Sequence, residues 1–234
     1  MKISLLIPTL NEIDGMRVIM PRIKKEWYHD LLIVDGRSTD GTIEYAKEHR
    51  YPIIIQKKRG PRHALLEAVE NLTGDVIITF SPDGNCIPEL IPACIAKIKE
   101  GYDMVIVSRY ADGAKSYDDN PMTKFGNVMA NVLINSLHGG HYIDSMGIYR
   151  AYKKSLVYDL QLDKDEGYVT AEWIFHTIIS WEPLLSIRCA KRKLKVAEIP
   201  GDEPARIGGV AKLQPFRWGG SYLFQIFREK FIWK

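Results

Sequence analysis

The amino-acid sequence predicts one α/β domain with a mostly parallel, Rossmann-like sheet flanked by helices. In the first half, short β-branched apolar runs alternate with longer segments of helical period. A polar loop follows four of these apolar runs, as expected for strands that end at one functional edge. The chain has 234 residues, 46% hydrophobic and 26% charged, which suits a globular domain and excludes a disordered or fibrous protein.

The elements follow from these patterns in chain order. Strands are expected at 2–8, 31–35, 52–55, 75–80 and 103–108, and helices between them at 12–26, 40–49, 62–72 and 88–99. The last of these helices begins with Pro88 and has Glu89 in its first turn, which favours a helix start. The second half predicts helices at 121–137, 168–180 and 213–232, a strand at 147–152, and a hairpin-like pair at 184–188 and 193–199. No repeat or linker divides residues 1–234, so one domain is expected.

The net charge of +3 is unevenly distributed. Residues 188–234 contain eleven Lys and Arg against four Asp and Glu, an excess of seven, which leaves −4 for the preceding residues. Such a basic end is typical of a protein with an anionic partner, or of a solvated basic face, and charge alone does not decide between them. The three cysteines are too few and too irregularly spaced for a disulfide framework or a zinc site, so we expect small buried side chains.

No apolar run approaches the roughly 18–20 residues of a membrane-spanning helix, and no separate apolar signal segment precedes Pro8. We therefore expect a mature protein that begins at Met1 in the cytoplasm. The C-terminal segment 214–234 is aromatic and basic, and the spacing of Tyr222, Ile226 and Phe227 places apolar groups on one helix face. That face suits a membrane interface, the protein core or a homodimer interface, and these alternatives stay open.

Two polar loops carry residues typical of nucleotide-diphosphate chemistry. The loop at 34–42 places Asp35 at a strand end, where a carboxylate can accept hydrogen bonds from a base or ribose, although a plain turn would look the same. The loop at 80–85 places Asp83 and Asn85 two residues apart, so that their oxygens can hold one hard divalent cation. Pro-Asp-Gly is also a strong turn signal by itself.

Taken together and in this order, the motifs resemble those of the family 2 inverting glycosyltransferases, which have a GT-A fold. The likeness is greatest to their polyprenyl-phosphate branch, typified by dolichyl-phosphate mannose synthase. It runs from Ile3 to about Leu213 and rests on residues 7–12, 34–42, 59–64, 73–75, 101–110, 144–152 and 206–213. The resemblance implies a nucleotide-sugar half at 1–110, an acceptor half at 111–213 and a C-terminal amphipathic basic helix at 214–234.

The resemblance also implies roles for individual residues. At the nucleotide sugar we expect Pro8, Thr9, Asn11, Glu12, Asp35, Arg37, Arg59, Arg62 and Asp83. At the acceptor we expect Arg109, Lys124, Asp144, Glu172, Arg206 and Lys212. Asp83 and Asn85 are the expected ligands of Mg²⁺ or Mn²⁺, and Asp83 and Arg109 the expected catalytic residues. The chain has Gly36 and Ser81 where the family usually carries acids, so a metal is expected to arrive with the sugar nucleotide.

The implied reaction is an in-line displacement at the anomeric carbon with inversion, in which a cation at Asp83 stabilises the leaving diphosphate. A hydroxyl acceptor needs a carboxylate base, for which Asp144 and Glu172 are candidates, whereas a phosphate monoester needs only cations to hold it. We therefore expect transfer from a nucleotide sugar to a polyprenyl phosphate at the cytoplasmic membrane face, in cell-envelope glycan biosynthesis. A glycan or protein hydroxyl acceptor and a non-catalytic nucleotide-sugar-binding protein are the alternatives. Nucleic-acid binding is not expected, because no recognition motif is present.

One helix face carries a repeated polar residue type. Asn127, Asn131 and Asn135 recur every four residues and so share a face of the helix expected at 121–137. They are expected either to bond a neighbouring helix or to line the acceptor groove.

Overall fold

The computed structural model describes residues 1–208 and 214–233. Its seven-stranded sheet has the order β3-β2-β1-β4-β6-β5-β7. The strands are β1 (Ile3–Thr9), β2 (Asp30–Asp35), β3 (Ile53–Ile55), β4 (Val76–Thr79), β5 (Met104–Ser108), β6 (Arg150–Lys153) and β7 (Val196–Pro200). Strand β6 is antiparallel to β4 and β5, and the other paired strands are parallel. The mostly parallel sheet expected from the sequence is confirmed.

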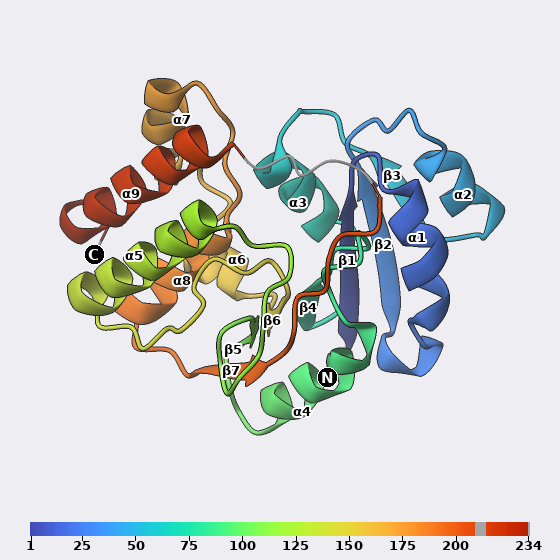
Figure 1. The fold of residues 1–234 in the computed structure, drawn as a ribbon, viewed down its shortest axis with the longest axis horizontal. Coiled ribbons are helices and arrows are strands. Elements are labelled where there is room, and N and C mark those ends of the chain that lie inside the picture. The colour runs from blue at the N-terminus through green and yellow to red at the C-terminus, as the bar shows by residue number, and fades with distance from the viewer. Residues whose placement is uncertain (209–213, 234) are drawn as a thin grey trace.

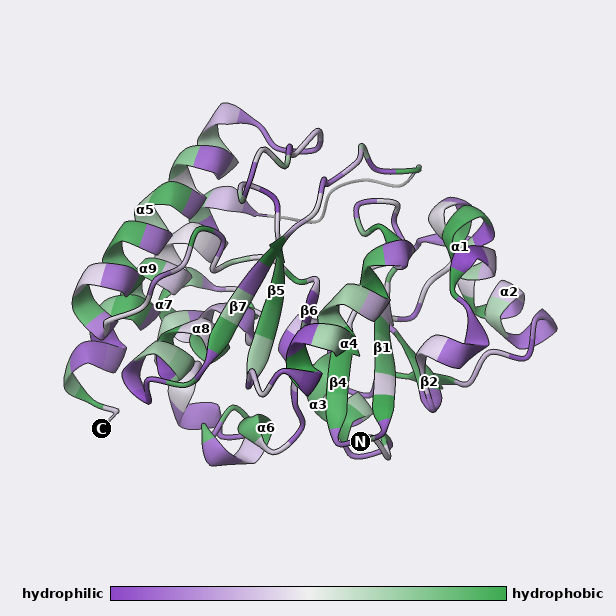
Figure 2. Ribbon diagram, turned by 90° about the horizontal axis from the view of Figure 1, so that it is seen from below, coloured by the Kyte–Doolittle hydropathy of each residue, from purple (hydrophilic) through white to green (hydrophobic). Residues whose placement is uncertain are grey.

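Helices cover both faces of this sheet. They are α1 (Ile13–Ile19), α2 (Thr42–Glu48), α3 (Pro61–Val69), α4 (Ile91–Lys99), α5 (Pro121–His138), α6 (Leu156–Asp159), α7 (Val169–Phe175), α8 (Glu182–Lys191) and α9 (Pro215–Phe231). Figure 1 shows α5, α7, α8 and α9 gathered at one end of the molecule and α1 and α2 at the other. Alternate strand residues face two apolar cores, with Leu6 in the core beside α5 and α8, and Leu5 and Ile7 in the core beside α1 and α4. Figure 2 shows that β1, β4 and β5 consist mostly of hydrophobic residues.

Several sequence-based boundaries are wrong, each for a physical reason. The segment 184–188, expected as a hairpin strand, belongs to helix α8. Residues 181–190 are all buried, so their sequence shows no alternation of apolar and polar residues from which a helix could be predicted. The helix expected at 12–26 ends at Ile19, since Pro21 lies in a short 3₁₀ turn, Met20–Arg22. The helix expected at 168–180 ends at Phe175, where His176 adopts a left-handed conformation with φ of 49°. Helix α6 was not expected.

The topology brings the polar loops to one edge of the sheet. The carboxyl ends of β1 and β2 are in register, with Thr9 opposite Asp35, and β4, β5 and β7 run in the same direction. Strand β6 runs the opposite way, so it begins at this edge with Arg150. The three cysteines are free and buried, as expected. In the part of the chain that the structure describes, no helix is long and apolar enough to span a bilayer.

Candidate functional site

Asp35 ties the first two strand-end loops together. Its side chain is 0% exposed, and its carboxylate accepts hydrogen bonds from Thr9 Oγ1 at 2.8 Å, Ser38 N at 2.7 Å and Ser38 Oγ at 2.6 Å. Asn11, with a left-handed φ of 55°, joins the same network, because its backbone N–H donates to Ser38 Oγ at 2.8 Å. The structure therefore places Asp35 beneath the loop surface, where it holds the loop conformation.

Four other residues expected at the nucleotide differ in their exposure and contacts. Glu12 is buried, and its backbone N–H donates to Thr42 Oγ1 at 2.9 Å. Pro8 is half-buried within β1, and Arg59 is exposed in the loop before α3. Arg37 is exposed and donates from Nη2 to the carbonyl of Lys57 at 2.9 Å. Their roles toward a nucleotide stay predictions.

The loop after β4 is covered by a cation of the protein itself. Asp83 is 5% exposed, and its Oδ2 lies 2.8 Å from Arg206 Nη1. The same guanidinium lies 3.8 Å from Glu12 Oε1 and 3.9 Å from Asp118 Oδ2. The backbone N–H of Ile207 donates to the Asp83 carbonyl at 2.7 Å. Arg206, expected at the acceptor, thus lies against the predicted metal ligand.

Close packing at Gly84 fixes this arrangement. A Cβ at Gly84 would come within 2.7 Å of Ile207 Cγ1, and the glycine has a positive φ of 99°. Only glycine lets the β4 loop meet the segment of Arg206 at this distance. The contact between residue 84 and residue 207 therefore depends on the glycine of the Pro-Asp-Gly turn.

Asp83 and Asn85 fit a hard divalent cation. Asn85 Oδ1 is buried and has no hydrogen-bond partner among the residues that the structure describes, while its Nδ2 donates to Asp118 Oδ2 at 2.8 Å. A carboxylate and a free amide oxygen on one loop are ligands that Mg²⁺ accepts, usually with substrate phosphates completing its coordination. Within the described residues, no group of three or more His, Cys, Asp or Glu side chains forms a metal site by itself. An ion held here thus needs oxygens from a ligand.

Arg109 and Asp144 form a tight ion pair at the end of β5. Arg109 Nε and Nη2 donate to the two Asp144 oxygens at 2.7 and 2.9 Å, and the Arg109 backbone N–H adds a third bond at 3.1 Å. Arg109 Nη1 also lies 3.5 Å from Glu203 Oε1. Burial alone would raise the pKa of Asp144, but the hydrogen bonds and charge of Arg109 hold it below its ordinary value. Asp144 is therefore a buried partner of Arg109 in this structure.

Glu172 makes the second long-range pair, with Arg62. Arg62 is 2% exposed and donates from Nε and Nη2 to the Glu172 carboxylate at 3.3 and 3.0 Å, and from Nη1 to Asp165 at 2.6 Å. Its guanidinium lies over the Tyr168 ring at 4.4 Å. This cluster joins the start of α3 to η4 (Asp165–Gly167) and α7, so it connects a predicted nucleotide residue with a predicted acceptor residue.

Of the remaining acceptor candidates, Lys124 is exposed on the first turns of α5, and Lys212 lies outside the described residues. The three asparagines of α5 differ in their hydrogen bonding. Asn131 Oδ1 accepts from Ser145 N at 2.9 Å, and Asn135 Nδ2 donates to the Tyr142 carbonyl at 2.9 Å, so both hold the segment that carries Asp144. Asn127 makes no such bond in the described structure and faces a groove.

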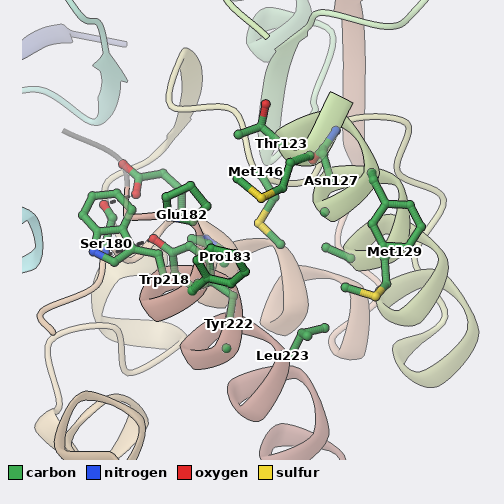
Figure 3. Close-up of a pocket in the computed structure, with 18 of the residues that line it drawn as sticks. Thr123, Asn127, Met129, Met146, Ser180, Glu182, Pro183, Trp218, Tyr222 and Leu223 are labelled. Atoms are coloured by element: carbon green, nitrogen blue, oxygen red, sulfur yellow. Dashed lines mark hydrogen bonds between the residues drawn. The ribbon is translucent and has the colours of Figure 1, made fainter. Parts of the chain in front are cut away.

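An acceptor groove was one of the two alternatives for the asparagine face of 121–137, but the position and the apolar lining of this groove were not predicted from the sequence. It has a volume of about 490 Å³ and lies between α5, α9 and the start of α8, with Arg109 and Pro61 also in its lining (Figure 3). Most of its lining is apolar and comes from Met122, Phe125, Met129, Met146, Ile148, Phe216, Trp218, Tyr222, Leu223 and Ile226. Two features of the sequence indicated the helices that border it: the aromatic character of 214–234 and the asparagine face of 121–137. We name this space the α5–α9 groove.

Comparisons with known proteins place the chain in a family. The sequence profile described as glycosyl transferase family 2 matches residues 4–161, more than half of the chain. The chain belongs to glycosyltransferase family 2. The membership that the motifs implied is thereby confirmed, and the protein is a family 2 glycosyltransferase.

Relatives of this glycosyltransferase include proteins named for polyprenyl phosphates. Dolichol-phosphate mannosyltransferase from Pyrococcus furiosus is 34% identical over 49% of this chain and 35% of that protein. Undecaprenyl-phosphate 4-deoxy-4-formamido-L-arabinose transferase from Proteus mirabilis is 27% identical over 67% of this chain and 50% of that protein. The chain thus spans half or less of the length of these two relatives. Glycosyltransferase AglJ from Haloferax volcanii is 27% identical over 97% of this chain and 71% of its own.

A solved structure confirms the GT-A fold. Glucosyl-3-phosphoglycerate synthase from Mycobacterium tuberculosis, in complex with Mn²⁺, uridine diphosphate and glucosyl-3-phosphoglycerate, superposes with a TM-score of 0.65. The match covers 98% of this chain and 79% of that chain at 16% identity. The architecture is therefore shared, while the ligands of that enzyme are its own.

Proposed function

We propose that this glycosyltransferase transfers a sugar, with inversion, from a nucleotide-diphosphate sugar to a polyprenyl phosphate. The observation that carries the proposal is the α5–α9 groove, whose lining is apolar and which includes Arg109. A polyprenyl phosphate combines an apolar chain with an anionic head, and a groove of methionine and aromatic side chains beside an arginine offers a partner for each part. Dolichol phosphate and undecaprenyl phosphate appear in the names of two relatives, which supports this acceptor class.

The ion pairs support a phosphate nucleophile over a hydroxyl. A hydroxyl acceptor needs a carboxylate that is free to take its proton. Both carboxylates expected as bases, Asp144 and Glu172, instead accept bidentate hydrogen bonds from Arg109 and Arg62. A phosphate monoester is already nucleophilic near neutral pH, because its second pKa is about 6. The arrangement therefore favours an acceptor that needs no protein base.

On the donor side, Asp83 and Asn85 would hold Mg²⁺ or Mn²⁺ together with diphosphate oxygens. When bound, such an ion supplies positive charge that stabilises the leaving diphosphate. The Mn²⁺ in the glucosyl-3-phosphoglycerate synthase complex is consistent with this proposal. Arg206 occupies the Asp83 carboxylate in this structure, so donor binding would require Arg206 to move from Asp83. Asp35 and Ser38 hold the neighbouring loop in place for the nucleotide.

We further propose that the enzyme acts at the cytoplasmic membrane face as a peripheral protein. Large apolar side chains are exposed on α5 and α9, which border the groove, and on α7, which packs against α9; among them are Phe125 at 68%, Phe216 at 83% and Trp173 at 75%. A polyprenyl phosphate stays in the bilayer, so its enzyme must present an apolar surface to the interface. The exposed aromatic residues of α5, α7 and α9 supply such a surface.

A transfer assay tests the proposal. The protein is incubated with radiolabelled sugar nucleotides, with and without polyprenyl phosphate, in Mg²⁺, Mn²⁺ or EDTA. Label in the organic phase that depends on the lipid and on the metal is the expected result. Label on an added glycan would assign a hydroxyl acceptor, and nucleotide-sugar binding without turnover would assign a non-catalytic binding protein.

A further inference from the structure

Two polar side chains in the α5–α9 groove have unused hydrogen-bonding atoms. Asn127 is 6% exposed, and neither its Nδ2 nor its Oδ1 has a partner in the described structure. Glu182, the first residue of α8, is 3% exposed; its Oε2 accepts from Ser180 Oγ, whereas its Oε1 has no partner among the described residues. Figure 3 shows both side chains in the groove, with Met146 between them in the view. A buried unpaired polar group costs stability, so a ligand is the natural partner.

The types of unused atoms restrict what that ligand can be. Asn127 Nδ2 is a donor, while Asn127 Oδ1 and Glu182 Oε1 accept. A prenyl chain would pair none of them. A phosphate dianion has no donors, so it would leave both acceptors unpaired and would meet an acidic group. A ligand with several hydroxyl groups can donate to both acceptors and accept from the amide.

We propose that Asn127 and Glu182 bind hydroxyl groups of the sugar that is being transferred and thereby select which sugar the enzyme accepts. The inference rests on the proposed function, because it assumes that a sugar reaches the groove beside Arg109. Pro61, the first residue of α3, also lines the groove, so the groove adjoins the segment of Arg59 and Arg62, which are expected at the nucleotide sugar. Burial raises the pKa of Glu182, although Arg150 and Ser180 act in the opposite direction. A hydroxyl group can pair with either protonation state of this acid.

The test compares Asn127→Ala and Glu182→Gln with the wild type on two donors that share a nucleotide, UDP-glucose and UDP-galactose, and on GDP-mannose. For the donor that the wild type prefers, we expect kcat/KM to fall about 10- to 100-fold, with loss of the preference between the two epimers. Binding of UDP and GDP alone, measured by calorimetry, should be unchanged. Glu44→Gln and Asn71→Ala, at exposed positions away from the groove, are the matched controls.

A second measurement separates binding from a structural role. Asn127→Leu removes two unpaired atoms without emptying the groove, so we expect an equal or higher Tm together with weakened binding of the sugar nucleotide relative to the free nucleotide. A lower Tm with unchanged relative affinity would overturn the inference. Glu182→Gln that binds every donor normally but transfers nothing would also overturn it, because Glu182 would then be a base. Failure of the wild type to label lipid would reject the proposed acceptor, while the affinity ratio would still test the sugar contacts.

Discussion

The replacement Asp144→Asn tests the ion pair between Arg109 and the fully buried Asp144. Asp144 is fully buried and accepts three hydrogen bonds from Arg109, from Nε at 2.7 Å, from Nη2 at 2.9 Å and from the backbone N–H at 3.1 Å. Asparagine keeps the volume but replaces one acceptor oxygen by a donor that faces the guanidinium. Among the described residues, Glu203, at 3.5 Å, would then be the remaining carboxylate beside Arg109.

Removing one partner of a buried ion pair costs about 3–5 kcal/mol, because the other charge stays buried without compensation. Arg109 is 20% exposed and retains Glu203, so we expect the lower end, about 3 kcal/mol of unfolding free energy. For a chain of this size, that corresponds to a decrease in Tm of about 6–12 °C. Urea denaturation at pH 7 measures the free energy, and Asp112→Asn, at an exposed position, is the control.

The same pair predicts a pH dependence. Arg109 lowers the pKa of Asp144 against the effect of burial, so the carboxylate stabilises the fold above the pKa of the unfolded state, about 3.9. This contribution is lost as the pH falls through the lower pKa of the folded state. The difference between wild type and Asp144→Asn should therefore shrink below about pH 4. A difference under about 1 kcal/mol at pH 7, or one that grows in acid, would refute the reasoning.

Four further outcomes are expected. Asp83→Asn should abolish transfer and lower the Tm, because Asp83 is buried and pairs with Arg206 at 2.8 Å; full activity of this variant in EDTA would contradict the metal role. Arg206→Gln should bind Mn²⁺ more tightly in the absence of nucleotide, because the substitution removes the guanidinium that pairs with Asp83. Electron paramagnetic resonance measures this affinity, and an unchanged value would argue against competition between Arg206 and the metal. Glu172→Gln should keep substantial turnover per folded molecule but lose about 2–3 kcal/mol of stability, because the buried arginine it contacts retains one other acid; an inactive, stable variant would instead identify a base. Phe227→Ser with Phe231→Ser should weaken sedimentation with anionic liposomes at equal Tm, and unaltered binding would assign the membrane contact elsewhere.

The strands and the functional edge could be predicted from the sequence, whereas the contacts across the site could not. Strands such as β2 contain a continuous apolar run bounded by polar residues, so local pattern identifies them, and their parallel order brings their ends together. Asp83 and Asn85 were therefore found as a pair on one loop. The partners of Arg62 and Arg109 lie 110 and 35 residues away, and no periodicity relates such positions.

The missed elements have the same cause. Helix α8 is buried from Glu182 to Ala190, so its sequence lacks the polar stripe that marks a surface helix. The α5–α9 groove arises where two helices far apart in the chain pack against each other, and its volume depends on packing rather than on local sequence. Asn127 could be assigned to a helix face, but its unused amide appears only once the neighbours of that face are known.

Helix α9 shows why core packing and membrane contact are compatible predictions for one segment. Glu229 is fully buried and accepts from the buried Arg188 at 2.9 and 3.1 Å, and Gln225 donates to the Gly167 carbonyl at 2.8 Å. Phe227 and Phe231 are 49% and 80% exposed on the same helix. One face of α9 thus completes the core, and another carries exposed phenylalanines. Deletion of 214–234 would remove the carboxylate partner of Arg188 and expose the apolar sides of α5 and α8. Loss of liposome binding on truncation would then report unfolding, so the membrane proposal must be tested by exchanging exposed aromatic residues with α9 intact.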